Sequence, residues 1–219
     1  MKRKILSFLL AVCIFLFLTG TSVFVTLAFR PLYYHDIRSM DIPKKSGFSE
    51  KVIRENYDAL IDYNLPIADG KLIFPSFPMS KTAEIHFEEV KDIFDCFKFT
   101  AIFAAVVAAV GIAISVKKRE YLFLKYTAVV SIGIPVVLGG LTAAFWDKVF
   151  ILFHELVFDN DYWMFDPDTD PIITILPDEF FEHCALMIVS SVAAGALVCL
   201  ILYFILGRKK NGNESKKTN

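Results

Sequence analysis

The sequence has few residues of the kinds that build metal sites. It contains four cysteines and four histidines in 219 residues, and no Cys-x-x-Cys or His-x-x-x-His pair occurs. A structural zinc site normally uses such closely spaced ligands. The acidic stretch over residues 159–170 lacks the central glycine and the terminal glutamate of an EF-hand loop. We therefore predict neither a metal nor another cofactor.

The sequence also lacks the signature of a serine hydrolase and an excess of basic charge. No Gly-x-Ser-x-Gly motif occurs, so no nucleophile elbow is indicated. Lys and Arg number 23 against 24 Asp and Glu, which gives a net charge of -1. This balance gives no indication of nucleic acid as a partner. The residues present fit a mechanism with a general base better than one with an enzyme nucleophile.

Apolar residues are abundant and gather into four long runs. They make up 55% of the chain, and the mean hydropathy is +0.52. The runs cover residues 5–29, 97–116, 121–145 and 184–206. Each has about 20 or more residues, enough for a helix to cross a hydrocarbon layer about 30 Å thick. The sequence thus predicts an all-α membrane protein with four transmembrane helices and a small mixed extracytoplasmic cap.

The first apolar run has two interpretations. Met1-Lys2-Arg3-Lys4 followed by an apolar stretch also describes a secretory signal peptide. However, the run is longer than a usual signal core, and no clear Ala-x-Ala cleavage site precedes Arg30. Its length favours an uncleaved first span.

Basic residues cluster before the first run, between the second and third runs, and after the fourth. The positive-inside rule makes all three places cytoplasmic. The protein is therefore predicted to span a bacterial cell membrane with both termini on the cytoplasmic side. The outer segment at residues 146–183 carries ten carboxylates against one lysine. The predicted order is a cytoplasmic N-terminus with span one (1–29), an outer segment (30–96), spans two and three with a basic loop (97–145), a second outer segment (146–183), span four (184–206) and a cytoplasmic tail (207–219).

Helical periodicity predicts two helices in the first outer segment. An amphipathic helix is expected over residues 48–65, with Ser49 as its N-cap. Prolines over residues 65–78 exclude a long helix there. Residues 80–95 are predicted as another helix, either continuous with span two or broken near Lys91.

The second outer segment carries three further expectations. Residues 145–158 are predicted to continue outward from span three as an apolar-faced helix, and residues 172–176 as a short strand. Cys96 and Cys184 both lie at outer ends of spans. They are predicted either as free thiols, which is the preferred interpretation, or as a disulfide.

A histidine lies among carboxylates and aromatics in residues 153–167, at the edge of a predicted span. Histidine has an ordinary pKa near neutrality, so it can exchange a proton at working pH. Polar, proton-competent groups at such a position usually mark a site. His154 and His86 both lie in outer segments beside spans, and they are the candidate catalytic residues.

Two motifs in the outer segments resemble those of a known membrane family. The longer one reads Phe153-His154-Glu155-Leu156-Val157-Phe158-x-Asn160-Asp161-x-Trp163-x-x-Asp166-Pro167-x-x-Asp170. The shorter one reads Glu84-Ile85-His86-x-x-Glu89-Val90-Lys91. Together they resemble the lipoprotein intramolecular transacylase (Lit) family of Gram-positive bacteria, whose four-span layout is also similar. That family usually has aspartate at the position of Glu89.

The resemblance implies an enzyme whose substrate is a lipoprotein with a diacylglyceryl thioether on its N-terminal cysteine. Members move the sn-2 acyl chain from glycerol to the cysteine α-amine, beside membrane lipid. By resemblance, His154 and His86 are catalytic: His154 is expected to be the base and His86 the acid or oxyanion donor, with the reverse assignment open. Asn160, Trp163 and Asp166 are expected to orient the substrate.

Two other classes of function remain open on the sequence. One is a membrane metalloenzyme or metal-binding protein that uses the same two histidines. The other is a non-catalytic membrane scaffold whose acidic outer loops bind a partner protein. The sequence indicates neither an oligomeric state nor a preferred lipoprotein.

Overall fold

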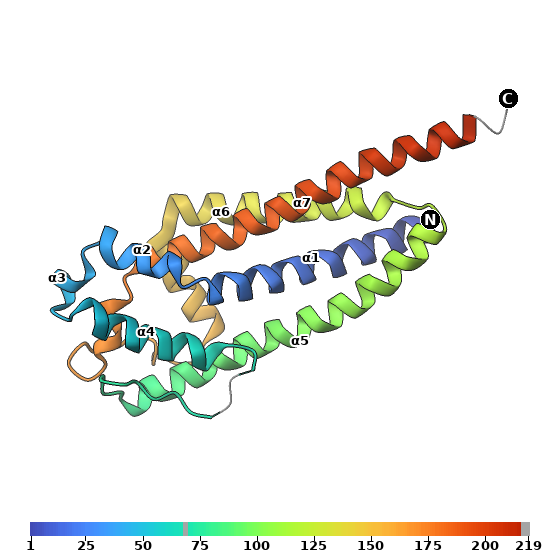
Figure 1. Ribbon diagram of the computed structural model, residues 1–219. Coiled ribbons are helices and arrows are strands. Elements are labelled where there is room, and N and C mark those ends of the chain that lie inside the picture. Colours follow the sequence, from blue (N-terminus) through green and yellow to red (C-terminus); the bar gives the residue numbers. More distant parts are fainter. Residues whose placement is uncertain (68–69, 216–219) are drawn as a thin grey trace. The chain divides into compact units, whose positions relative to one another are not determined.

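The computed structural model describes residues 1–67 and 70–215, and every regular element in these ranges is helical (Figure 1). Four long helices are present: α1 (Lys2–Ala28), α5 (Lys81–Lys117), α6 (Leu122–Val157) and α7 (Asp178–Ser215). Each is long and apolar enough to cross a membrane. The predicted all-α class with four transmembrane helices is therefore confirmed.

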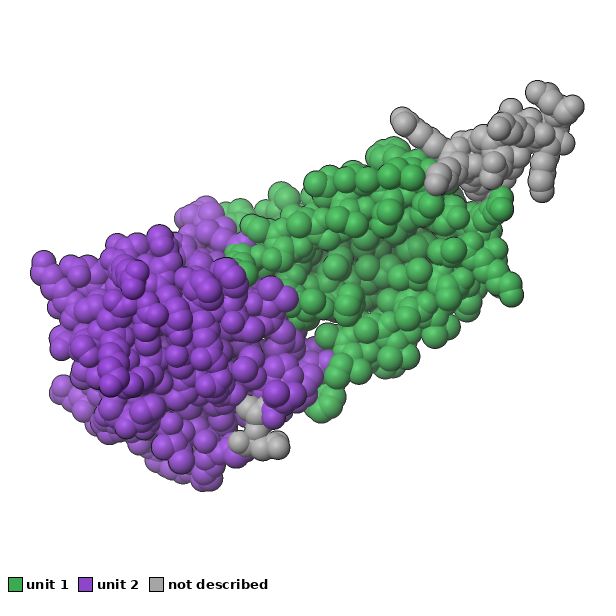
Figure 2. All heavy atoms as spheres, in the orientation of Figure 1, with its two compact units in different colours: residues 1–22, 99–140, 187–219 green, residues 23–98, 141–186 purple. Residues whose placement is uncertain are grey.

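The chain divides into two compact units (Figure 2). The first contains residues 1–22, residues 99–140 and the described residues from 187 onward. Helices of this unit approach one another closely at two glycines, which have no side chain. A Cβ added at Gly111 would come within 2.6 Å of the Leu10 side chain, and one at Gly195 within 2.9 Å of Leu18. These glycines therefore let neighbouring helices pack in lipid, where small residues favour close approach.

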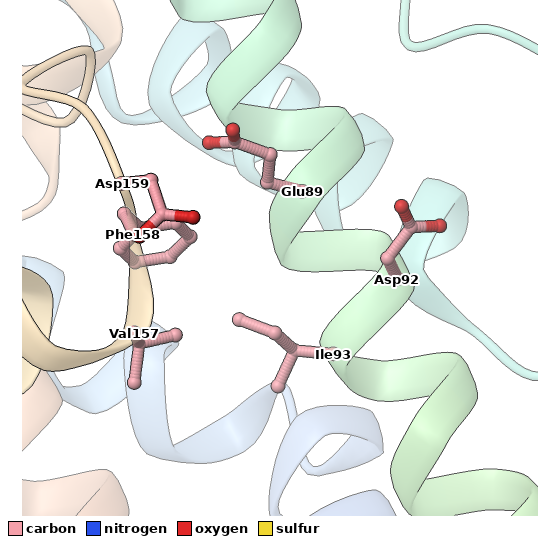
Figure 3. A pocket seen from close by; sticks show the side chains of 6 residues that line it. All are labelled: Glu89, Asp92, Ile93, Val157, Phe158 and Asp159. Carbon is pink, nitrogen blue, oxygen red and sulfur yellow. The ribbon is translucent and has the colours of Figure 1, made fainter.

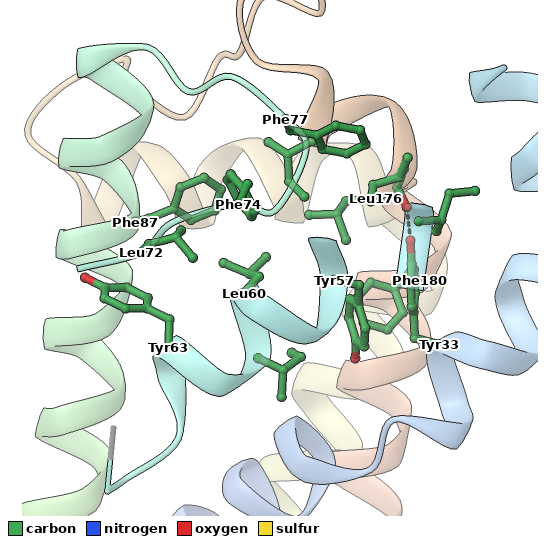
Figure 4. Close-up of a cluster of buried hydrophobic side chains, with 14 of the residues drawn as sticks. Tyr33, Tyr57, Leu60, Tyr63, Leu72, Phe74, Phe77, Phe87, Leu176 and Phe180 are labelled. Atoms are coloured by element: carbon green, nitrogen blue, oxygen red, sulfur yellow. Dashed lines mark hydrogen bonds between the residues drawn. The ribbon is translucent and has the colours of Figure 1, made fainter. Parts of the chain in front are cut away.

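The second unit contains residues 23–98 and 141–186. Its shorter elements are α2 (Pro31–Ser39), α3 (Ile42–Ser46), α4 (Glu50–Asn64) and the 3-10 helix η1 (Pro171–Ile175). They enclose an aromatic core in which Tyr33 stacks on Tyr57 with ring centroids 3.8 Å apart (Figure 4). The Tyr33 hydroxyl donates to the Ile175 carbonyl. This unit thus has a hydrophobic core of its own.

Local signals explain where several elements begin and end. The Ser49 hydroxyl accepts a hydrogen bond from the Val52 amide at the start of α4, so the predicted helix and its cap are confirmed. Helix α3 ends at Gly47, whose φ of 77° lies in the left-handed region that glycine adopts at low cost. Helix α5 runs unbroken through Lys91, which settles the alternative that the sequence left open.

Two expectations about local structure need correction. Residues 172–176 are not a strand, because Pro171 starts a 3-10 turn in which the Ile173 amide donates to the Asp170 carbonyl. The cap is therefore helical, not mixed, in the part of the chain that is described. The disulfide alternative is also wrong, since Cys96 and Cys184 are both free.

Candidate functional site

The first turns of α5 carry one of the two candidate histidines. The Ser80 hydroxyl caps this helix by accepting from the Ala83 amide at 3.1 Å. The Ser80 amide donates in turn to the buried Asp170 carboxylate at 2.6 Å. His86 and Glu89 follow on the capped helix, before the apolar run that begins at residue 97. Because they are three residues apart, their side chains share one face.

The second candidate histidine lies at the end of α6. That helix contains a non-helical residue at Phe145, which separates the apolar run from the turns that carry His154. The Nδ1 atom of His154 lies 2.7 Å from the Phe150 carbonyl oxygen. Since a carbonyl can only accept, Nδ1 carries the proton and Nε2 retains a lone pair. His154 is thus held in the tautomer suited to a general base acting through Nε2.

The two imidazoles face one another within an aromatic enclosure. Their ring centroids are 6.3 Å apart and their planes differ by 30°. Phe158 lies beside both, 4.7 Å from His86 and 5.7 Å from His154. Trp163 lies 4.6 Å from His154, and Phe165 lies 5.4 Å from His86. The long motif therefore folds back on itself and closes over the short one.

This enclosure keeps both imidazoles neutral. His86 is 6% exposed, and its burial, reinforced by the nearby His154, lowers its pKa to about 4. Burial also lowers the pKa of His154, opposed by its hydrogen bond to Phe150 and by the charge of Asp178. A buried imidazole resists protonation because the charged form loses more hydration than the neutral form. At neutral pH both rings are available to accept a proton.

A hydrogen bond joins the two motifs beside the histidines. The Asn160 side chain accepts from the Tyr162 amide at 3.0 Å and donates to Glu89 at 2.7 Å. Asn160 therefore fixes its own turn and ties it to α5. A cavity of about 200 Å³ lies next to this bond (Figure 3). Its lining residues are Glu89, Asp92, Ile93, Val157, Phe158 and Asp159.

Four of the five predicted site residues come together: His86, His154, Asn160 and Trp163. Asp166 is exposed, and its carboxylate accepts from the Asp168 amide within its own turn. The other two histidines lie outside this site. His183 contacts the fully buried Asp36 at 2.9 Å, and His35 is exposed.

Sequence reasoning missed three contributors to this arrangement. Glu89 was seen only as a departure from a motif, although its spacing from His86 already predicted a shared face. Asp170 anchors the start of α5 from 90 residues away, and no local pattern reports such a contact. The carbonyl that orients His154 belongs to Phe150, one turn earlier on the same helix.

The described part of the chain contains no group of three or more His, Cys, Asp or Glu side chains arranged to hold a metal ion. The two histidines and Glu89 instead offer proton acceptors, while Asn160 and the aromatic rings hold them in place.

Comparisons with known proteins match nearly the whole chain. The family model described as "Lipoprotein intramolecular transacylase Lit" matches residues 8–181. The in meso structure of the membrane integral lipoprotein intramolecular transacylase Lit from Bacillus cereus is 33% identical, with a TM-score of 0.93, and covers 96% of this chain and 98% of that one. A variant of that protein with one histidine changed to arginine is 32% identical, with a TM-score of 0.88, and covers 97% and 95%. No match was found among curated proteins.

Proposed function

Because the chain belongs to the lipoprotein intramolecular transacylase Lit family, we propose that it moves an acyl chain within a diacylglyceryl lipoprotein. The acyl group moves from the sn-2 ester of the glyceryl group to the α-amine of the N-terminal cysteine that carries this glyceryl group. The product is an N-acyl, S-monoacylglyceryl lipoprotein. The protein is a multi-pass membrane protein, so a substrate anchored in the bilayer can reach it by lateral diffusion.

The pair of neutral imidazoles is the observation that carries this proposal. The rings lie 6.3 Å apart among aromatic side chains that suit a lipid substrate. An α-ammonium has an ordinary pKa of about 8, so at neutral pH it must lose a proton before its nitrogen can attack. His154 is suited to remove that proton because its hydrogen bond to Phe150 leaves Nε2 as an acceptor.

The ammonium first gives up one proton, which His154 passes to solvent, and the transfer itself then needs two proton movements and no enzyme nucleophile. The amine nitrogen attacks the ester carbonyl carbon, and its surplus proton passes to Nε2 of His154. His86, which is neutral, donates a hydrogen bond to the oxyanion, and the proton taken up by His154 passes to the departing glycerol oxygen, directly or through His86. The C–N bond forms, the C–O bond to glycerol breaks, and the glycerol oxygen gains one proton. The reverse assignment of the two histidines gives the same balance.

The substrate itself supplies much of the rate enhancement. Its amine and its ester are carried by one molecule, so the reaction is already unimolecular and gains from proximity. The protein must then hold one conformation, accept a proton and stabilise developing charge. The chain's short inventory of catalytic groups is sufficient for these tasks.

Tandem mass spectrometry of a lipoprotein tests the proposal. The protein is expressed in a bacterial host that lacks other N-acylating enzymes. The expected result is an unchanged total mass, a blocked α-amine and the loss of one acyl chain from the glyceryl fragment. Cells that express His154→Ala at an equal level serve as the control. A free amine with both glyceryl esters intact in the wild-type strain would reject the proposal and favour the scaffold alternative.

Treatment with a chelator distinguishes the proposed function from the remaining alternative, a metalloenzyme or metal-binding protein that uses the same two histidines. A metal-dependent protein would lose activity in EDTA and regain it on addition of the metal. The proposed mechanism uses only protein groups and predicts the same conversion with and without chelator.

A further inference from the structure

Glu89 lines the cavity beside the two histidines, and one oxygen of its carboxylate lacks a partner among the described residues. Oε1 of Glu89 accepts the hydrogen bond from Asn160, whereas Oε2 is enclosed and has no hydrogen-bond partner among the described residues. An enclosed, unpaired carboxylate oxygen is costly, and native structures rarely keep one without a reason. Oε2 of Glu89 is therefore placed to receive a donor from outside the chain.

The surroundings of Glu89 favour a donor that carries positive charge. Figure 3 shows the Glu89 and Asp159 carboxylates reaching from opposite walls toward the same space, while Asp92 points away. Carboxylates that converge on one cavity repel one another unless a cation lies between them. The cavity, of about 200 Å³, has room for a small cationic group.

The position of the cavity relative to the histidines narrows the choice of cation. Glu89 follows His86 by three residues on α5, so the two side chains are neighbours on the helix surface. Phe158 lines the cavity and also lies 4.7 Å from the His86 ring. A cation bound at Glu89 is thus one side chain away from the proton acceptors.

We propose that Oε2 of Glu89, assisted by Asp159, binds the α-ammonium of the substrate's N-terminal cysteine. This inference rests on the proposed function and identifies the group that recognises the amine. An ammonium has three N–H donors, so one can bond to Glu89 while another stays available for proton transfer. Asn160 acts as a positioning residue, because its bond to Oε1 fixes which oxygen of Glu89 is offered to the substrate.

The same carboxylate explains how substrate and product are distinguished. The α-ammonium of the substrate is charged at neutral pH, whereas the amide nitrogen of the product is neutral and has lost two of the three donors. Conversion therefore removes the ion pair with Glu89. The site binds the free amine and releases the acylated one.

Glu89→Gln provides the main test, because it keeps the shape and the oxygen that Asn160 contacts while removing the charge. With a synthetic diacylglyceryl-cysteine lipopeptide at pH 7, kcat/KM is expected to fall by roughly 10- to 100-fold, mostly through KM. The difference in kcat/KM between wild type and Glu89→Gln should become smaller as pH rises above about 8, where the substrate amine becomes neutral. Glu89→Asp, which keeps the charge, should recover much of the activity.

The matched control is Glu88→Gln, the same chemical change at an exposed neighbour on α5. It should leave kcat/KM within about twofold of wild type. A binding measurement adds a second readout: wild-type protein in nanodiscs should prefer the free-amine lipopeptide over its N-acetylated form, and Glu89→Gln should not. Equal thermal stability of wild type and Glu89→Gln excludes a folding defect.

Each outcome decides between the two proposals. If wild type converts the lipopeptide and Glu89→Gln matches it, or loses equal activity at pH 7 and pH 9, the ammonium site is overturned and the transacylase function stands. If wild type neither converts the lipopeptide nor prefers the free amine, both proposals are rejected.

Discussion

Neutral histidines in an aromatic enclosure suit a reaction that begins by removing a proton from an amine. His86 is buried and His154 half-buried, and among the described residues no carboxylate forms an ion pair with either ring. A protonated imidazole could not act as a base. The aromatic enclosure therefore packs both rings and favours their neutral form.

The two histidines are expected to act as one unit. His86→Ala and His154→Ala should each lower lipopeptide conversion by about 10²- to 10⁴-fold, the range for loss of a general acid or base. The double variant should be little worse than either single one, because each step needs both rings. Conversion is measured by mass spectrometry on protein of equal yield.

His35→Ala is the matched control for these variants, since His35 is exposed and lies outside both motifs. Its activity should equal that of wild type. Full activity in His154→Ala would contradict the mechanism even with the family assignment intact.

The lowered pKa of His86 also predicts a pH dependence of stability. Its pKa is about 4 in the folded protein against 6.5 for the exposed side chain. Between these values the unfolded chain binds a proton that the folded protein does not, so the free energy of unfolding falls as pH falls. Above pH 6.5 His86 causes no such loss of stability. Toward pH 4 the free energy of unfolding falls by on the order of 2 kcal/mol because of this residue.

Thermal unfolding in detergent at pH 7 and pH 4.5 measures this contribution. The drop in Tm should be smaller in His86→Gln than in wild type, whereas His35→Gln should behave as wild type. Identical drops in all three proteins would mean that His86 is protonated in the folded state at the lower pH.

At the scale of elements, the position of His86 depends on how α5 begins. Asp170, at the start of η1, accepts from the Ser80 amide and also from the Thr169 hydroxyl. This side chain is buried, so its loss leaves the Ser80 amide without that acceptor. The start of one element thus depends on a residue 90 positions away.

Asp170→Ala is therefore expected to destabilise the protein by about 1–3 kcal/mol, the range for leaving a buried donor unpaired. Thermal unfolding gives the shift. Asp168→Ala, in the same loop but exposed, is the matched control and should change stability by less than about 0.5 kcal/mol. Equal stability of the two variants would show that the Asp170 contact does not anchor α5.

Elements whose signals are local could be predicted from the sequence, and elements that depend on distant contacts could not. Helix α4 and its Ser49 cap followed from apolar spacing and a capping residue. The 3-10 turn at Pro171–Ile175 did not, because its β-branched residues pack into a core built from α2 and α4. The break at Phe145 was also missed, because neither proline nor glycine occupies that position.

In the candidate site, too, the sequence predicted some features and not those that depend on distant contacts. His86 and His154 were found because histidine is rare and lies in motifs. The enclosed oxygen of Glu89 was not found, because burial and pairing belong to the fold. The bond between Asn160 and Glu89 joins positions 71 residues apart, and one sequence carries no record of that proximity.

At the scale of the whole molecule, four long apolar helices and the distribution of basic residues determine the expected topology. We propose that both termini are cytoplasmic and that the His86 and His154 segments face outward, as the positive-inside rule requires. This orientation places the proposed site on the side where mature lipoproteins reside.

Cysteine labelling of intact cells tests this topology. In a background with the four native cysteines replaced, Asp161→Cys should react with a membrane-impermeant maleimide from outside. Lys118→Cys, in the loop after α5, should react only after the membrane is opened. Both positions are exposed. The reverse pattern would place the histidines on the wrong side for the proposed substrate.

The free thiols of the chain bear on how the protein is made. All four cysteines are unpaired, and the second unit is held by its aromatic core and hydrogen bonds, without a cross-link. We therefore expect biogenesis to need neither a thiol oxidase nor a disulfide isomerase. The folded yield should be the same in a reducing culture medium and in a strain without an oxidative folding pathway.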